Sequence, residues 1–559
     1  RAAYCRLQLA RAAYRTGDTS RALRMVKSAL KSVETVSADA VVYQCEHLIG
    51  CVERERGRSP RALEAFLRSV GTIERMRVGV AVDEFKATFL HDKVAVYEDA
   101  IAFCVEDGRD ELILKAFELV ESSKSRALAE LIAKYAPGRA PKNPRARNGS
   151  ARRHRAGLQK LIEDINWYAS QAIREEDAGR QASAAQYRKT VVRCEREMAE
   201  LCRRVGSGDA GISGLAPSRS VTAHDLCDSL AKHEASIEYF ITGDQISAFV
   251  ATRSGLRIKR HFGSLRRIEL ILSGLQFQLR KFGYGSDYLL HHQGSLEHAI
   301  DRHLLGLKAE LFDPLEDMVA ERRMIIIPHG PLHYVPFHAL GDSNGYLNDR
   351  FEISYAPSAA VLNLCRGVAT KARRVWRRRT INQKTTAEGR QRHQLVAFGI
   401  SDPELPNIGA EIRDVAAMFP DSIQIMDGDA TRETLFRVAP SARYLHVATH
   451  GYFRRDNPMF SYLKLADCRL NFYSLLDLNL NAEMVTLSAC HTGAHAVMPG
   501  DELHGLMRGF LHAGAPSMVI SLWSANDGAT AMLMKLMYQN LRAGESKRSA
   551  LRKAQLAVR

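Results

Sequence analysis

The sequence predicts a multidomain protein in which an all-α N-terminal region is followed by an α/β domain with a mainly parallel sheet covered by helices. Residues 1–135 place apolar side chains at three- and four-residue spacing with almost no proline, which is typical of helices. From residue 324 onward, short apolar runs alternate with helical patterns. At 559 residues the chain exceeds the size at which one core keeps growing, so two or three domains are expected.

The N-terminal region contains two similar segments. "LARAAYRTGDTSRALRMVKSAL" (9–30) and "LIGCVERERGRSPRALEAFLRSV" (48–70) place Gly17 and Gly57, and then Ala22 and Ala62, 40 residues apart. The small residues allow paired helices to approach closely, and each glycine suits the turn between them. The pattern resembles tetratricopeptide repeats, with a period longer than the usual one of about 34. A plain helical bundle is the alternative for residues 1–135, and either arrangement offers a surface to a protein partner.

Three segments separate this region from the α/β domain. Residues 136–157 read as a basic linker rich in Pro, Gly and Ser, and residues 158–215 as a charged antiparallel helical hairpin. Residues 216–295 contain a three-stranded β-meander (235–262), with turns at Thr242-Gly243-Asp244 and Arg253-Ser254-Gly255, and a helix that leads onward.

Residues 296–559 form the expected α/β domain. One amphipathic helix is expected just before this domain, near 264–282, and a second at its start, near 296–321. The strands expected after them are "MIIIPH" (324–329), "LVAFGI" (395–400), "YLHVA" (444–448), "MVTLSA" (484–489) and "SMVISLW" (517–523). Because these runs are apolar at nearly every position, each strand should be buried on both faces, as in a parallel sheet between helices such as 409–419 and 503–515.

The composition narrows the class of protein. Hydrophobic residues at 46% and charged residues at 25% are ordinary for folded globular proteins. The longest apolar runs fall short of the roughly 18 residues of a membrane span, so no membrane contact is expected. Ten scattered cysteines without a CxxC pair indicate a reduced, cytoplasmic protein with free thiols. The missing initiator methionine, and an end inside a helical pattern, lead us to expect a fragment.

The formal charge of +16 raises nucleic acid as a partner. Much of it lies in two stretches without acidic residues, "GRAPKNPRARNGSARRHR" (138–155) and "KARRVWRRR" (371–379). Neither has a series of aromatic residues that could stack on bases, so we interpret both as solvated basic linkers and do not favour nucleic acid.

Polar residues follow three of the predicted strands where those strands end. His450 follows "YLHVAT", Cys490 follows "MVTLSA", and Asp527 comes shortly after "SMVISLW". Ligands of parallel sheets bind beyond this edge. A histidine beside a thiol can keep it as thiolate and later protonate a leaving amine. The backbone N–H groups of Gly451 and Cys490 could hold an oxyanion. The alternative is packing, because lone cysteines are among the most buried residues.

At this point the sequence resembles a known family. "LHVATHGYF", "LSACHTG", "GDELHGLMRGFLHAGAPSMVISLW", "IIIPHGPLHYVPFHAL" and "ISYAPSAAVL" are similar to the CHAT domain, a caspase-like and separase-like cysteine peptidase domain often fused to tetratricopeptide repeats. "LVESSKSRALAEL" (119–131) is similar to the end of the repeat region in such proteins. The resemblance implies a caspase-like fold, with His450 as the general acid/base and Cys490 as the nucleophile.

The resemblance also implies a specificity pocket. Asp527 stands where separase-like members carry an acid that receives the basic side chain before the scissile bond, so cleavage after Arg or Lys is our hypothesis. A helix N-cap is the equal alternative for Asp527. Asp501 and Glu502 fall in a loop often acidic in this family and are candidates to line the same cleft. His491 and Asn526 depart from the usual residues, which affects pocket charge and specificity but not the Cys–His pair.

The expected function is therefore that of a cysteine endopeptidase, of bacterial origin, whose substrates are proteins or peptides and whose helical repeats bind a regulatory protein. We expect no cofactor and no metal, because His491, His495 and His504 fit no ligand spacing with His450. The alternative function is a catalytically silent interaction scaffold, in which the repeats carry the function.

Overall fold

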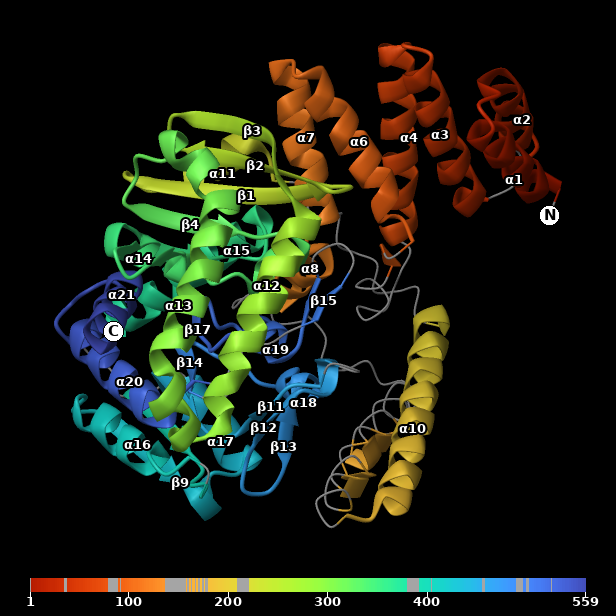
Figure 1. The fold of residues 1–559 in the computed structure, drawn as a ribbon. Coiled ribbons are helices and arrows are strands. Elements are labelled where there is room, and N and C mark those ends of the chain that lie inside the picture. The colour runs from red at the N-terminus through yellow and green to blue at the C-terminus, as the bar shows by residue number, and fades with distance from the viewer. Residues whose placement is uncertain are drawn as a thin grey trace.

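The structure is a computed structural model. It describes residues 1–559 except 1, 35–37, 79–88, 91, 136–156, 158–159, 162, 166, 169–170, 173–174, 176–178, 209–220, 380–391, 404, 455–457, 489–495, 499–501 and 524. Pairs of antiparallel helices lead from the N-terminus to two successive β-sheets, and the C-terminus lies beside the second sheet (Figure 1).

The N-terminal region is helical, as the sequence predicts. Its described helices are α1 (Ala2–Arg15), α2 (Thr19–Lys31), α3 (Asp39–Glu55), α4 (Ser59–Val78), α6 (Val94–Asp107), α7 (Asp110–Ser123) and α8 (Arg126–Tyr135). Gly17 and Gly57 occupy the turns of the first two pairs with φ of +82° and +67°, a conformation that L side chains rarely adopt. The 40-residue spacing therefore marks equivalent turns in successive helical pairs.

The first sheet combines the predicted meander with two later strands. Its order is β3 (Gly255–Ser264), β2 (Gln245–Thr252), β1 (Glu234–Thr242), β4 (Arg323–Ile327) and β7 (Glu352–Tyr355). The first three pair antiparallel, whereas β4 pairs parallel with β1 and with β7. The run 324–329 therefore joins the meander, and not the later strands with which we grouped it.

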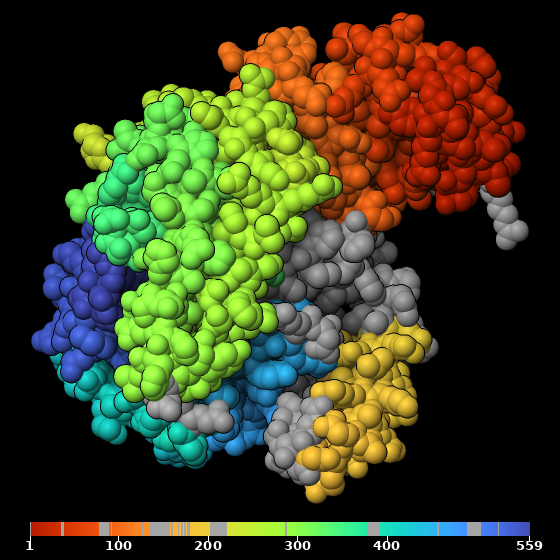
Figure 2. Space-filling view, in the orientation of Figure 1, coloured from red at the N-terminus to blue at the C-terminus, as the bar shows by residue number. Residues whose placement is uncertain are grey.

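Both faces of the first sheet are covered by helices. On one face α12 (Leu265–Arg280) and α13 (Ser286–Leu311) share a core with β1 and β2. On the other face α6, α7 and α11 (Ala223–Ser229) share a core with Phe240, Phe249 and Ile325. Figure 2 shows α12 and α13 as one outer face, with the first helical pairs projecting beyond it. Helices α3, α4, α6 and α7 thus contribute to one core shared with the sheet.

The second sheet is parallel throughout its described strands. Its order is β17 (Met518–Val519), β14 (Met484–Ser488), β10 (Ala442–Ala448), β8 (His393–Gly399) and β9 (Ser422–Met426). One face packs on α16 (Ile408–Ala417), α20 (Asp527–Arg542) and α21 (Lys547–Val558), and the other on α17 (Arg432–Val438) and α19 (Leu506–His512). The predicted α/β class, with a mainly parallel sheet covered by helices, is confirmed.

The two basic stretches differ in outcome. Residues 138–155 lie outside the described residues. Residues 371–379 are not a linker, which corrects our interpretation: they form the C-terminal part of α15 (Ala359–Arg379). Val368 and Ala372 are buried one turn apart, and Trp376 Nε1 donates to the carbonyl of Asn481 at 3.0 Å. The apolar stripe holds this helix to the protein while its arginines carry the charge.

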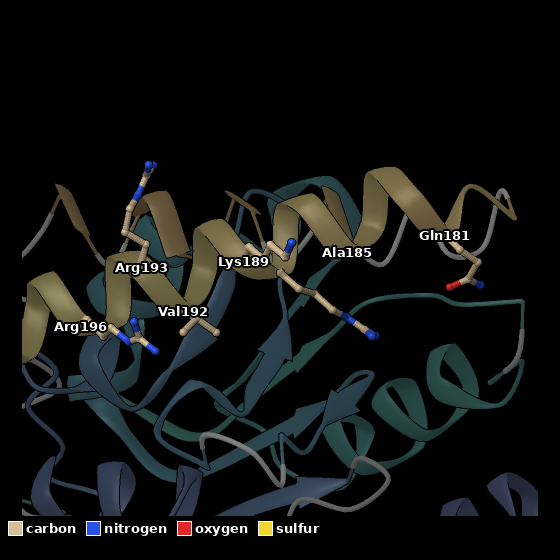
Figure 3. Close-up of a pocket in the computed structure, with 7 residues that line it drawn as sticks. Gln181, Ala185, Lys189, Val192, Arg193 and Arg196 are labelled. Carbon is tan, nitrogen blue, oxygen red and sulfur yellow. The ribbon is translucent and has the colours of Figure 1, made fainter.

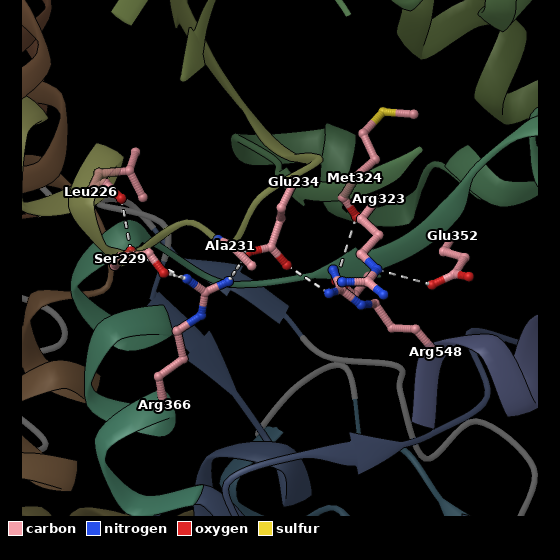
Figure 4. Close-up of polar contacts among 10 residues, drawn as sticks. Leu226, Ser229, Ala231, Glu234, Arg323, Met324, Glu352, Arg366 and Arg548 are labelled. Carbon is pink, nitrogen blue, oxygen red and sulfur yellow. Dashed lines mark hydrogen bonds and ion pairs between the residues drawn. The ribbon is translucent and has the colours of Figure 1, made fainter. Parts of the chain in front are cut away.

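Glu234 joins the first sheet to helices that pack near the second (Figure 4). Its carboxylate lies 2.5 Å from Arg366 Nη2 on α15 and 2.6 Å from Arg548 Nη2 on α21, and it accepts a hydrogen bond from the N–H of Ala231 at 3.1 Å. Burial raises the pKa of Glu234, but that N–H and the two guanidinium groups lower it by more, so the pKa lies below its ordinary value.

The segment 119–131 forms a second, buried junction. Glu121 accepts hydrogen bonds from the N–H groups of Ala359 at 2.8 Å and Ala360 at 2.9 Å, at the start of α15. Lys124 is fully buried, donates to the carbonyl of Pro328 at 3.3 Å, and lies 3.3 Å from Glu238 Oε1 on β1. This motif therefore links the last helical pair to the first sheet and to the start of α15.

No helix within the described parts of the chain is long and apolar enough to cross a lipid bilayer.

Candidate active site

The candidate site is set by the pairing of β10 with β14. These strands are parallel neighbours in register, with Tyr444 opposite Met484 and Ala448 opposite Ser488. The N–H of Thr449 then donates to the carbonyl of Ser488 at 3.3 Å. His450 follows Ala448 by two residues, and Cys490 follows Ser488 by two residues. The two strands thus end at the same edge of the sheet, with their last residues opposite each other. Cys490 itself lies outside the described residues.

The backbone around His450 is fixed by a small antiparallel sheet of β11 (Gly451–Tyr452), β12 (Tyr462–Lys464) and β13 (Arg469–Asn471). The His450 carbonyl accepts a hydrogen bond from the N–H of Lys464 at 2.9 Å, and Gly451 pairs with Leu463. Thr449 Oγ1 donates to the Lys464 carbonyl at 2.6 Å. The backbone at Thr449 and His450 is therefore hydrogen-bonded to β12 on one side and to β14 on the other. The imidazole of His450 is half-buried.

Lys464 also connects this edge to the end of β8. Its Nζ lies 2.9 Å from Asp402 Oδ2, and Asp402 follows β8 by three residues. The strand order reverses at β8, because β9 lies on one side of it and β10 on the other. Such a reversal opens a crevice at the carboxyl ends of the strands, which is where open α/β sheets bind ligands.

The other histidine of the same strand has a different environment. His446 is fully buried, and its Nε2 lies 2.8 Å from Glu411 Oε1 on α16. Tyr538 packs edge-on against its ring and donates to Thr486 Oγ1 at 3.0 Å. Burial raises the pKa of Tyr538. His446 thus belongs to a buried polar cluster between the sheet and helices α16 and α20, whereas the half-buried His450 lies beyond the end of β10.

Asp527 opens α20 without capping it. Its Oδ2 accepts hydrogen bonds from the backbone N–H of Asn407 at 2.8 Å and from Asn407 Nδ2 at 2.9 Å. The cap of α20 is the neighbouring Asn526, whose Oδ1 accepts from the N–H of Ala529 at 3.0 Å. The N-cap alternative for Asp527 is therefore wrong. The carboxylate instead joins α20 to the residue before α16.

A small pocket lies beside Asp527 at the carboxyl edge of the sheet. Its walls come from β14, the residues before α16, α16 itself, α20 and the segment between β17 and α20. The lining residues are Leu405, Ile408, Glu411, Ser488, Ser521, Ala525, Asp527 and Thr530. Its volume of about 20 Å³ holds roughly one water molecule, so an arginine side chain enters only if the walls separate.

The remaining predicted site residues are placed only in part. Asp501, His491 and His495 lie outside the described residues. Glu502 and His504 begin and end β16 (Glu502–His504), which pairs antiparallel with β15 (Ala496–Met498), but their side chains are not described. Whether Asp501 and Glu502 line the cleft therefore stays a prediction.

Sequence reasoning missed Thr449, Asp402 and Asn407. Thr449 stands directly before His450, so its position beyond the strand was a usable signal. Asn407 precedes the helical pattern of residues 409–419, but its contact with Asp527 spans 120 positions and leaves no local pattern. Asp402 likewise meets Lys464 across 62 positions.

A second pocket, about 520 Å³ in volume, runs along α10 (Gln181–Gly208) and bears on the nucleic-acid alternative. Its lining is Gln181, Ala185, Arg188, Lys189, Val192, Arg193 and Arg196. These side chains spread along the helix and do not converge on one point (Figure 3). With no aromatic residue in this lining, the pocket lacks a platform on which bases could stack.

Comparisons with known proteins agree with this organisation. Residues 300–559 match the family model described as the CHAT domain. Tetratricopeptide repeat protein 28 of Mus musculus is 24% identical over 42% of this chain, and that of Homo sapiens is 23% identical over 42%. The chain spans 11% of the length of each of these curated relatives.

Among solved structures, two Saccharomyces cerevisiae separase–securin complexes align with 100% of this chain and 48% of the matched chain. The identities are 10% and 11%, and the TM-scores are 0.42 and 0.38.

Proposed function

We propose that this chain, whose residues 300–559 match the CHAT domain model, is a cysteine endopeptidase with Cys490 as nucleophile and His450 as general acid and base. The main observation in support of this proposal is the in-register pairing of Ala448 with Ser488. Both candidate residues lie two positions beyond that pair, on neighbouring parallel strands.

The proposed reaction is acyl transfer to sulfur. His450 takes the thiol proton of Cys490, and the thiolate attacks the peptide carbonyl carbon. The N–H groups of Gly451 and Cys490 hold the oxyanion, and loss of one such donor would cost about 100- to 1000-fold in rate. His450 then protonates the leaving amine as the carbon–nitrogen bond breaks. Water hydrolyses the thioester, which releases the acid product and restores the thiol.

Asp527 supports a preference for Arg or Lys before the cleaved bond. A carboxylate that meets a guanidinium in a desolvated pocket gives charge-assisted hydrogen bonds, which are about twice as strong as neutral ones. In this role the side chain of Asp527 exchanges its contacts with Asn407 for the substrate as the small pocket widens.

The helical region is the proposed site for a regulatory protein in a reduced, cytoplasmic setting. The curated relatives are named for tetratricopeptide repeats, and such repeats offer extended concave surfaces. Because α6 and α7 share a core with the first sheet, a partner that moves these helices would act directly on the α/β layers.

The test compares the wild-type chain with Cys490→Ala and His450→Ala on a diverse peptide library, with new termini identified by mass spectrometry. We expect cleavage in the wild type and its loss in both variants, with thermal unfolding midpoints nearly unchanged. Cys5→Ala is the matched control, because Cys5 is exposed on α1 far along the chain from the site.

Retained cleavage in Cys490→Ala would contradict the assignment. A second readout separates the enzyme from the silent scaffold. A thiol-reactive probe at neutral pH should modify Cys490 faster than the other nine cysteines, since an activated cysteine reacts as thiolate. Slow, uniform labelling together with no cleavage would favour the scaffold.

A further inference from the structure

Three side chains of metal-binding type converge in the helical region. His47 and Cys51 lie one helical turn apart on α3, and Asp99 lies on α6 of the next pair. His47 Nε2 is 2.7 Å from Asp99 Oδ2 and 3.7 Å from Cys51 Sγ, and that Sγ is 3.9 Å from Asp99 Oδ2. Nitrogen, sulfur and oxygen thus form a compact triangle that joins two helical pairs.

The triangle differs from a catalytic triad. In a triad the two ring nitrogens of histidine serve two different partners, the nucleophile on one side and the carboxylate on the other. Here the same nitrogen, Nε2 of His47, faces both Cys51 and Asp99. Three possible ligand atoms within 4 Å of one another are close enough to share a common centre.

Two of the three distances are near those of a tetrahedral ion site. Bond lengths of about 2.0–2.3 Å to zinc place tetrahedral ligand atoms about 3.4 Å apart for nitrogen and oxygen, and about 3.6 Å apart when sulfur is one of them. The two separations from Cys51 Sγ, 3.7 and 3.9 Å, are near that value. The His47–Asp99 separation of 2.7 Å is a hydrogen bond, and it would open by less than 1 Å to admit the ion.

The site is reachable and has room for a fourth ligand. It lines a pocket of about 650 Å³ between α1, α3 and α6, and Glu55 lies in the same wall, two turns after His47. Arg11 and Arg15 face this pocket and oppose a cation, whereas Arg54 lies within 2.9 Å of both carboxylate oxygens of Glu106. Once the thiol loses its proton, Cys51 and Asp99 together supply a charge of −2 to the ion.

We propose that His47, Cys51 and Asp99 bind one divalent transition-metal ion of the zinc type, with Glu55 or water as the fourth ligand. The mixed nitrogen, sulfur and oxygen set suits such an ion and not magnesium, which prefers oxygen ligands alone. The imidazole binds through the lone pair of Nε2, and the thiol proton passes to solvent as the sulfur–metal bond forms.

Two properties follow for the bound site. Metal binding displaces the thiol proton of Cys51, so metal affinity should fall as the pH is lowered. The ion would also bridge α3 to α6, and thereby fix two successive helical pairs relative to each other.

The test uses cobalt(II) and zinc(II) on the full chain. Cobalt should give a sulfur-to-metal charge-transfer absorption in the wild type and in Cys5→Ser, and Cys51→Ser should lack it and bind one ion fewer. Loss of even an outer partner of a metal ligand costs about 10- to 100-fold in affinity, so His47→Gln should weaken zinc binding by at least that much. Zinc, but not magnesium, should raise the thermal unfolding midpoint of the helical region.

Circular dichroism shows whether each variant is folded. If Cys51→Ser does not fold, the comparison of wild type with His47→Gln replaces it. Equal absorption and equal ion count in wild type and Cys51→Ser would overturn the proposal, since cobalt would then occupy other thiols. A wild-type chain that binds no cobalt would overturn it as well.

Discussion

Glu121 and Ala359 meet at 2.8 Å across 238 positions of sequence, the carboxylate of Glu121 accepting the backbone N–H at the start of α15. A second oxygen of the same carboxylate accepts the N–H of Ala360 at 2.9 Å. A side chain of the helical region therefore satisfies the first free donors of a helix in the α/β region, where an anion is also favoured by the helix dipole.

Glu121→Gln is the first prediction. The amide offers one acceptor where the carboxylate offers two, so one buried N–H of α15 loses its partner at a cost of about 1–3 kcal/mol. We expect a lower thermal unfolding midpoint and faster amide hydrogen exchange at Ala359 and Ala360. Glu118→Gln is the control, since Glu118 is one-third exposed on the same helix and pairs with Lys115 at the surface. Unchanged exchange at the start of α15 would contradict the prediction.

The junction shows which parts of the fold local patterns predict. The helical pairs and most strands follow from apolar spacing, because burial on one face or two leaves a period in the sequence. Which strands pair leaves no such trace. The run 324–329 is as apolar as the run 484–489, yet β4 pairs with β1 and β14 with β10. Pairing partners depend on contacts across long stretches of chain.

At two places the charge of the sequence is a poor guide to burial and secondary structure, because tertiary contacts determine both. Lys124 stands among polar residues in the sequence, but its ammonium group is fully buried among carbonyl oxygens and Glu238. The basic stretch 371–379 reads as a linker, but it is the end of α15. At the candidate site the strand ends were predictable from spacing, whereas the contact of Asn407 with Asp527 was not.

Glu234 should make stability depend on acid pH. Its pKa in the folded chain is below the ordinary value of 4.5, so the carboxylate contributes stability that is fully present above pH 4.5 and is lost as the pH falls through the lowered pKa. Arg366 and Arg548 are about one-third and one-quarter exposed, which screens the pairs, and we expect Glu234→Gln to cost about 1–2 kcal/mol at pH 7.

The measurement for Glu234 is the urea midpoint of wild type and Glu234→Gln as a function of pH. The two curves should converge as the pH falls below 4.5. A constant difference across the acid range would show that the cost of the substitution comes from packing and not from charge. Glu118→Gln serves as the control, because Glu118 forms a surface pair with Lys115.

Two glycines of α3–α4 should respond to alanine in opposite directions. Gly57 has φ of +67°, and no atom lies within 4 Å of a Cβ added there. Alanine would therefore lower the stability through backbone strain alone, by about 1–2 kcal/mol. Gly71 lies within α4, and its nearest neighbour to an added Cβ is Arg75 Nη1 at 3.9 Å. Gly71→Ala should therefore stabilise the helix by up to about 1 kcal/mol. Thermal unfolding of the two variants checks both signs. Unchanged or raised stability in Gly57→Ala would contradict the assigned turn, and a loss of stability in Gly71→Ala would contradict the prediction for α4.

Asp527→Asn tests substrate choice, and it rests on the proposed peptidase activity. Asparagine keeps a carbonyl oxygen for Asn407, so the start of α20 should persist, while the negative charge of the pocket is reduced. Removing one partner of a desolvated charge pair costs about 2–5 kcal/mol, so cleavage after Arg or Lys should fall by about 30-fold or more. Cleavage at other residues should change little, because their side chains do not pair with this carboxylate.

The matched control for Asp527→Asn is Asp414→Asn, the same change on the surface of α16. Asp414 pairs with Lys535 at 2.9 Å, and both side chains are about half exposed. The cleavage sites of both variants are mapped on one peptide library. If Asp527→Asn and Asp414→Asn retain the same preference as the wild type, the basic side chain is selected elsewhere, and Asp527 serves only to hold α20 against the residue before α16. If cleavage after Arg and Lys alone declines in Asp527→Asn, the small pocket must widen on binding, because about 20 Å³ cannot hold a guanidinium.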